Sequence, residues 1–178
     1  MYLAQGAIIS MDLGKGHIIG KNTSDEFENK IKDSICYFLR NFLNKESFNL
    51  IDCTPYDELS LCNGEDLKNR VKRANLSESS LHLTLNVKKS KDNSIQCSIN
   101  EFDSKGYKFA KRICVVFEEN NYRNKGIKYS DVYNLLYIKK PSIIVDLELT
   151  INDGEDMVKK CATIAKILVN AILSLGTK

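Results

Sequence analysis

The chain has 178 residues, of which 43% are hydrophobic and 28% are charged. Such a composition is typical of a globular domain that buries its own core, and it excludes an intrinsically disordered chain. The net charge of +3 arises from 26 basic and 23 acidic residues spread along the sequence. No concentrated positive charge indicates a nucleic-acid partner. We therefore expect a single domain over residues 1–178.

Six cysteines are scattered along the chain without a Cys-x-x-Cys pair. This spacing argues against a structural zinc site and against a disulfide framework, so we expect reduced and mostly buried thiols. No stretch reaches the roughly 18 apolar residues that a membrane span requires, and the first residues lack the pattern of an export signal. Two locations follow as expectations: a cytoplasmic domain, or an exported domain whose export segment has been removed.

The first part of the chain predicts strands and helices in alternation. Residues 6–13 are an apolar run that ends at a glycine-bearing turn, which is typical of a buried strand. Capping residues and apolar side chains at helical spacing then predict an amphipathic helix over residues 25–43. A second strand is expected at 48–53, followed by a loop and a short helix near 67–74.

The second part of the chain continues this alternation. Residues 81–87 alternate between apolar and polar side chains, which predicts a strand with one apolar face, and residues 95–99 are expected to pair beside it. A helix is predicted at 107–117 and a long amphipathic helix at 156–175. The strongest strand pattern, at 142–149, predicts a central strand. The fold class is thus α/β, with a twisted, mostly parallel sheet flanked by helices.

Short motifs between residues 7 and 173 add a family resemblance. Residues 12–16 read Asp-Leu-Gly-Lys-Gly, residues 70–75 read Arg-Val-Lys-Arg-Ala-Asn, residues 125–128 read Lys-Gly-Ile-Lys, and residues 141–152 run from a proline to an asparagine. In this order they resemble the Asp-x-Gly-His-Gly, Arg-x-x-x-Ala-Asn, Arg-Gly-x-Lys turn and Pro-x-x-Leu-x-Glu motifs of zinc-dependent N-acetylmuramoyl-L-alanine amidases (amidase type 3). The resemblance implies the fold of these bacterial enzymes, which cleave peptidoglycan between glycan strand and stem peptide.

The same resemblance indicates which residues replace the zinc ligands of the family. Lys15 stands at the first histidine position, Asn86 at the second, and Glu26, or its neighbour Asp25 or Glu28, at the glutamate position. A protonated lysine cannot donate a lone pair, and an amide oxygen is a weak zinc ligand beside imidazole. We therefore expect no metal and no other cofactor at these positions.

A catalytic position, an ion pair and a set of binding residues are also expected near these positions. Asp146 stands where the family has its catalytic glutamate, and Glu148, on the same strand face, is positioned to compensate for the shorter side chain. Lys15 is expected to form an ion pair with Glu26 or Asp146 in the volume that the metal would fill. Arg70, with Lys15, Glu26, Asn86 and Glu148, completes the predicted set of binding residues.

Only two histidines are present, His17 and His82. At about 3.3 Å per residue, His82 lies about 13 Å along the strand from Asn86, too far for a shared metal bond of about 2 Å. His82 is therefore predicted to be a polar residue on a covered sheet face. His17 follows the glycine turn, where a rearranged backbone would bring it to a metal.

Two hypotheses follow for function. The first is a catalytically inactive amidase-like domain that acts as a binding or regulatory module, with a peptidoglycan fragment or a protein of an envelope or sporulation assembly as partner. The alternative is an active peptidoglycan amidase with a rebuilt zinc site formed by His17, Glu26 and Asp146.

Overall fold

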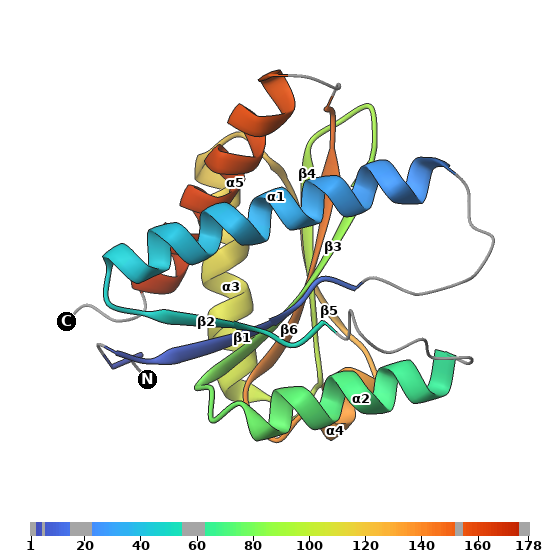
Figure 1. Ribbon diagram of the computed structural model, residues 1–178, viewed down its shortest axis with the longest axis vertical. Helices are drawn as coiled ribbons and strands as arrows, with labels where there is room; N and C mark the ends of the chain where they lie inside the picture. The colour runs from blue at the N-terminus through green and yellow to red at the C-terminus, as the bar shows by residue number, and fades with distance from the viewer. Residues whose placement is uncertain (1–2, 5, 15–22, 55–62, 152–154, 175–178) are drawn as a thin grey trace.

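The core of the fold is a sheet with the strand order β2-β1-β3-β6-β4-β5 (Figure 1). The structure, a computed structural model, describes residues 3–4, 6–14, 23–54, 63–151 and 155–174. The strands within these residues are β1 (Ile8–Asp12), β2 (Asn49–Asp52), β3 (Leu81–Lys89), β4 (Ser94–Ile99), β5 (Arg123–Tyr129) and β6 (Ser142–Leu149). The helices are α1 (Thr23–Lys45), α2 (Asn63–Leu76), α3 (Ser104–Glu119), α4 (Tyr133–Tyr137) and α5 (Glu155–Leu173).

Neighbouring strands run parallel except β4 and β6, which are antiparallel. The central position of β6 and the mostly parallel sheet confirm the predicted fold class. Helices α1, α3 and α5 pack together over one face of the sheet, and α2 and α4 lie on the other (Figure 1). None of the helices in the described residues combines the length and the apolar character needed to cross a membrane.

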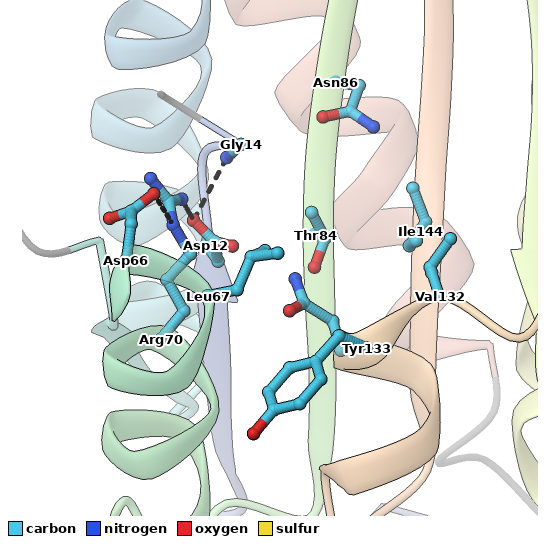
Figure 2. Close-up of a pocket in the computed structure, with 11 residues that line it drawn as sticks. Asp12, Gly14, Asp66, Leu67, Arg70, Thr84, Asn86, Val132, Tyr133 and Ile144 are labelled. Atoms are coloured by element: carbon cyan, nitrogen blue, oxygen red, sulfur yellow. Dashed lines mark hydrogen bonds and ion pairs between the residues drawn. The ribbon is translucent and has the colours of Figure 1, made fainter. Parts of the chain in front are cut away.

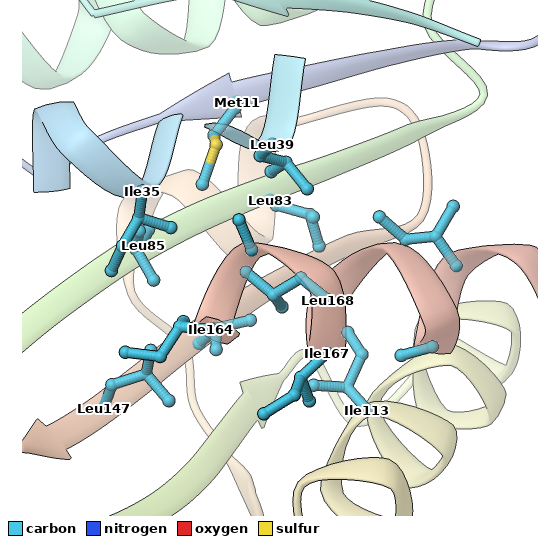
Figure 3. Close-up of a cluster of buried hydrophobic side chains, with 14 of the residues drawn as sticks. Met11, Ile35, Leu39, Leu83, Leu85, Ile113, Leu147, Ile164, Ile167 and Leu168 are labelled. Atoms are coloured by element: carbon cyan, nitrogen blue, oxygen red, sulfur yellow. The ribbon is translucent and has the colours of Figure 1, made fainter. Parts of the chain in front are cut away.

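The main core lies between the sheet and the first of these helix layers. Leu83 and Leu85 of β3 point into it, together with Ile35 of α1, Ile113 of α3 and Ile164 of α5 (Figure 3). Burying each such side chain contributes about 1.5–3 kcal/mol relative to leaving it exposed. The two-residue period of a strand then turns the intervening residues of β3 to the opposite face. The apolar core thereby determines which side chains are presented to α2 and α4.

Two expectations from the sequence were wrong. The strand at 95–99 does not pair with the strand at 81–87, because β6 inserts between them and pairs with both. The segment 125–128 is not a turn but part of the edge strand β5, where Gly126 adopts a φ of +83° and the pairing with β4 shifts register. Glycine at a bulge provides this positive φ without strain, so a residue that suggests a turn occurs within a strand.

The thiols of the described cysteines are reduced and buried, as predicted, whereas Cys62 lies outside the described residues. They belong to Cys36, Cys53, Cys97, Cys114 and Cys161.

His82 lies on the sheet face covered by α2 and α4, with a side chain that is 1% exposed. Its Nδ1 is 2.9 Å from the Ser10 hydroxyl, and its Nε2 is 3.4 Å from the Thr84 hydroxyl. Burial, with a smaller effect of Lys140, lowers the pKa of His82 to about 3. The prediction of a polar residue on a covered sheet face is confirmed, and the imidazole is neutral at neutral pH.

Acidification is expected to destabilise the fold through His82. Its pKa is lowered from 6.5 to about 3 by folding, so between these values the unfolded chain binds a proton that the folded chain does not. The stability that neutral His82 contributes is fully present above pH 6.5 and is lost as the pH falls toward 3. Between pH 7.5 and 4.5 the free energy of unfolding should fall by about 2.5 kcal/mol through this residue. Urea unfolding at both pH values measures this loss.

A His82→Gln variant serves as the control, because the amide keeps polar contacts but does not titrate. Its free energy of unfolding should fall less than that of the wild type over the same pH interval. Equal losses in both proteins would contradict the assignment to His82.

Candidate functional site

Polar side chains lie close together at the carboxyl ends of β3 and β6, on one face of the sheet. This is a common position for ligands in open α/β sheets. Asn86 is the register partner of Asp146 in the parallel pair β3–β6. On the antiparallel side, Gln96 lies opposite Asp146 and Ser94 opposite Glu148. Because residues two apart share a strand face, Asp146 and Glu148 lie on the same side of β6. The structure thus places three of the predicted site residues together.

Asn86 and Asp146 are directly bonded. The amide Nδ2 of Asn86 donates a hydrogen bond of 2.8 Å to Oδ1 of Asp146. The bond crosses from β3 to β6 in a partly buried position, where it satisfies a carboxylate oxygen that the family resemblance assigns to catalysis. The two residues therefore form a fixed pair rather than two independent groups.

Glu148 also has fixed partners. It accepts hydrogen bonds from the Lys125 ammonium at 2.6 Å and from the Ser94 hydroxyl at 2.9 Å. The Lys125 hydrogen bond is the largest cause that holds the pKa of Glu148 below its usual value. A cavity of about 330 Å³, hereafter the Asp146 groove, lies beside these groups. Its lining consists of Asn86, Val87, Lys88, Ser94, Gln96, Lys125, Asp146, Leu147 and Glu148.

Arg70 forms a buried ion cluster on the other side of Asn86 (Figure 2). Its Nε donates to Asp66 at 2.9 Å, one turn earlier on α2, and its Nη1 donates to Asp12 at the end of β1. The side chains of Arg70 and Asp12 are only 3% and 1% exposed. Burial raises the pKa of Asp12, and the Arg70 charge opposes this shift. Arg70 thus connects α2 to the sheet.

Gly14 allows the chain after β1 to lie directly against Asn86. Its φ of +55° lies in the left-handed region, and a Cβ at this position would collide with Oδ1 of Asn86. A glycine therefore allows the chain after β1 to approach β3 closely. Asn86 contributes to both the Asp146 groove and a second cavity that is bordered by Gly14 and Arg70.

Glu26 occupies a different environment. Its side chain is 73% exposed and lies 3.7 Å from Lys30, one turn along α1, and it lines neither of these cavities. Its neighbour Glu28 accepts the backbone N–H of Lys89. Exposed pairs of this type contribute little to stability. The structure does not bring Glu26 to Asn86 and Asp146.

Lys15, His17 and the side chain of Asp25 lie outside the described residues. The ion pair expected for Lys15, and the role of His17 in a rebuilt metal site, therefore remain predictions.

The described residues do not fit the zinc site that the resemblance implies. They contain no cluster of three histidine, cysteine, aspartate or glutamate side chains suited to a metal. Asn86 directs an amide N–H at Asp146, and a protonated amide nitrogen has no lone pair for a metal. A catalytic zinc ordinarily has three protein ligands and a water.

Some residues of the site were not predicted. Asp66 could have been identified from its four-residue spacing to Arg70, which suits an ion pair along a helix. Lys125 and Gln96 could not, because their proximity to Asp146 depends on strand pairings that the sequence does not reveal. Asn75, quoted only as part of a motif, connects α2 to the segment after α4 by bonding to the backbone of Tyr137 and Lys139.

Replacing Arg70 with methionine should destabilise the protein by about 3–5 kcal/mol, because Asp12 and Asp66 lose their buried counter-ion. Urea unfolding at pH 7 measures this change. Lys72→Met, at an exposed position of the same helix, is the control and should stay within about 0.5 kcal/mol of the wild type. Equal effects of the two substitutions would contradict the structural role of the ion cluster.

No family model and no curated protein matches the sequence. Solved structures match over nearly the whole chain. The catalytic domain of the CD27L endolysin, which targets Clostridia difficile, has a TM-score of 0.74 and 21% identity, covering 97% of this chain and 99% of its own. An N-acetylmuramoyl-L-alanine amidase from Clostridium difficile 630 has a TM-score of 0.75 and 20% identity, covering 96% and 97%.

A third structure is the CwlD amidase from Clostridioides difficile in complex with the GerS lipoprotein. It has a TM-score of 0.73 and 21% identity, and the match covers 94% of this chain and 98% of CwlD. The chain therefore has the fold of N-acetylmuramoyl-L-alanine amidase catalytic domains.

Proposed function

We propose that this protein is a binding or regulatory module of bacterial cell-wall biology, with an amidase fold that binds peptidoglycan fragments without cleaving them. The observation that carries the proposal is the hydrogen bond from Asn86 to Asp146. Hydrolysis by a metal-held water requires ligands for the metal and a carboxylate that is free to accept a proton from the water. The Asn86 amide engages one oxygen of the Asp146 carboxylate, Oδ1, and at this position it offers a poor zinc ligand in place of the histidine of the family.

The Asp146 groove has the chemistry of a binding site for a polar, uncharged ligand. Asn86, Gln96 and Ser94 offer amide and hydroxyl groups, and the charges of Lys125 and Glu148 neutralise each other across 2.6 Å. Amide and hydroxyl groups of this kind orient ligands through hydrogen bonds. Peptidoglycan presents the complementary amides and hydroxyls on its stem peptide and glycan.

Co-sedimentation with purified peptidoglycan tests binding, and mass spectrometry of the supernatant tests hydrolysis. The wild type should sediment with peptidoglycan and should release no stem peptide, with or without added zinc. The double variant Gln96→Ala and Lys125→Ala should bind about fivefold more weakly, which corresponds to about 1 kcal/mol.

Lys128→Ala is the matched control, because Lys128 is an exposed lysine on the same strand that does not line the groove. Failure of the wild type to sediment would refute peptidoglycan binding and would favour a protein partner, as in the complex of CwlD with GerS. Release of stem peptide would refute the loss of hydrolysis and would favour the alternative with His17, Glu26 and Asp146.

A further inference from the structure

A network of hydrogen bonds leads through the interior from Lys140, just before β6, to the second cavity on the polar face of the sheet. This cavity, of about 420 Å³, lies between α2 and α4 and is lined in part by Thr84 of β3 (Figure 2). We call it the α2–α4 cavity. The Lys140–Thr84 network, as we name it, passes in order through the side chains of Lys140, Ser77, Ser79, Ser10, His82 and Thr84.

The contacts of the network are continuous. The Ser77 hydroxyl lies 3.4 Å from the Lys140 ammonium and 3.0 Å from the Ser79 hydroxyl. The Ser79 hydroxyl lies 2.7 Å from that of Ser10, which is 2.9 Å from Nδ1 of His82. The last contact, of 3.4 Å, joins Nε2 of the imidazole to the threonine hydroxyl. Every member after the lysine is buried, so bulk water does not compete for these contacts.

The direction of the network is decided at Ala74, near the end of α2. The Ala74 carbonyl accepts the backbone N–H of Ser77 at 3.3 Å and the Lys140 ammonium at 2.7 Å. A carbonyl oxygen has two lone pairs, and these two donors use both. The Ser77 hydroxyl lies 2.7 Å from the same oxygen, but it has only one proton to donate. That proton is therefore left to Ser79.

One direction then follows for the remaining members. Because each hydroxyl has a single proton, Ser79 donates to Ser10, and Ser10 donates to Nδ1 of His82. The other acceptor near Ser10, the Leu81 carbonyl, is farther away at 3.4 Å. The neutral imidazole therefore carries its proton on Nε2. Nε2–H donates to Thr84, whose own hydroxyl proton is then available to an acceptor in the cavity.

We propose that the Lys140 ammonium sets the direction of this network and thereby makes Thr84 a hydrogen-bond donor toward the α2–α4 cavity. An ammonium group donates and never accepts, so it orients the network in this one direction. Without it, the Ala74 carbonyl regains a lone pair and takes the Ser77 proton. The other hydroxyls then reverse, His82 is protonated on Nδ1, and the threonine donates to Nε2 instead. Lys140 is thus a positioning residue, and this role does not depend on the function proposed for the Asp146 groove.

Nitrogen-15 NMR of the labelled protein at pH 7 tests the direction of the network. Long-range proton–nitrogen spectra distinguish a protonated from an unprotonated ring nitrogen, and a His17→Gln sample identifies the signals of His82. The wild type should carry the His82 proton on Nε2. A proton on Nδ1 in the wild type would overturn the proposal, whether or not any variant folds.

Variants of Lys140 test its control of the network. Lys140→Met should move the His82 proton from Nε2 to Nδ1, whereas Lys140→Arg, which keeps the charge and the donors, should leave it on Nε2. Lys139→Met, at the exposed neighbouring position, is the matched control and should give the spectrum of the wild type. The same tautomer in Lys140→Met and in the wild type would contradict the role of the ammonium.

A double variant separates transmission through the serines from a direct effect of the charge on the imidazole, since the Lys140 charge also contributes to the lowered pKa of His82. Ser79→Ala interrupts the network with a methyl group. In this background, Lys140→Met should no longer change the tautomer of His82. A change of equal size with and without the Ser79 hydroxyl would overturn the proposed route.

Discussion

The pairing of β3 with β6 is the constraint on which the site depends. The two strands are in register over their whole length, from His82 beside Ser142 to Lys89 beside Leu149. A slip of one residue would turn Asn86 into the apolar core, because successive side chains alternate between sheet faces. The large apolar layer against α1, α3 and α5 opposes such a slip. The same packing that stabilises the fold therefore fixes Asn86 beside Asp146.

Around this pair, two contacts of α2 hold the helix over the polar face of the sheet. Arg70 joins the helix to Asp12 at the end of β1, and Asn75 joins it to Tyr137 at the end of α4. These connections hold α2 and α4 over the sheet on one side of Asn86, with the edge strand β5 on the other. The result is a cavity on each side of one asparagine, one with paired polar groups and one with unpaired polar groups.

The sequence predicts the elements well and the site only in part. The apolar run at 142–149 and the helical periodicity of α1 and α5 are local patterns, which can be recognised within a short stretch of sequence. The insertion of β6 between β3 and β4 depends on strand pairings that join residues 46 to 60 positions apart, which no local pattern records. The family resemblance placed Asn86 and Asp146 in one site, and the strand pattern added Glu148. The resemblance also placed Glu26 there, whereas that side chain is exposed beside Lys30.

We propose that an asparagine–aspartate pair stands in place of a hydrolytic metal centre in this amidase fold. Zinc content, measured by elemental analysis after dialysis against buffer with trace zinc, tests it most directly. We expect far less than one zinc per chain in the wild type and no change on His17→Ala substitution. About one zinc per chain, lost in the His17→Ala variant, would refute this replacement and establish a rebuilt metal site.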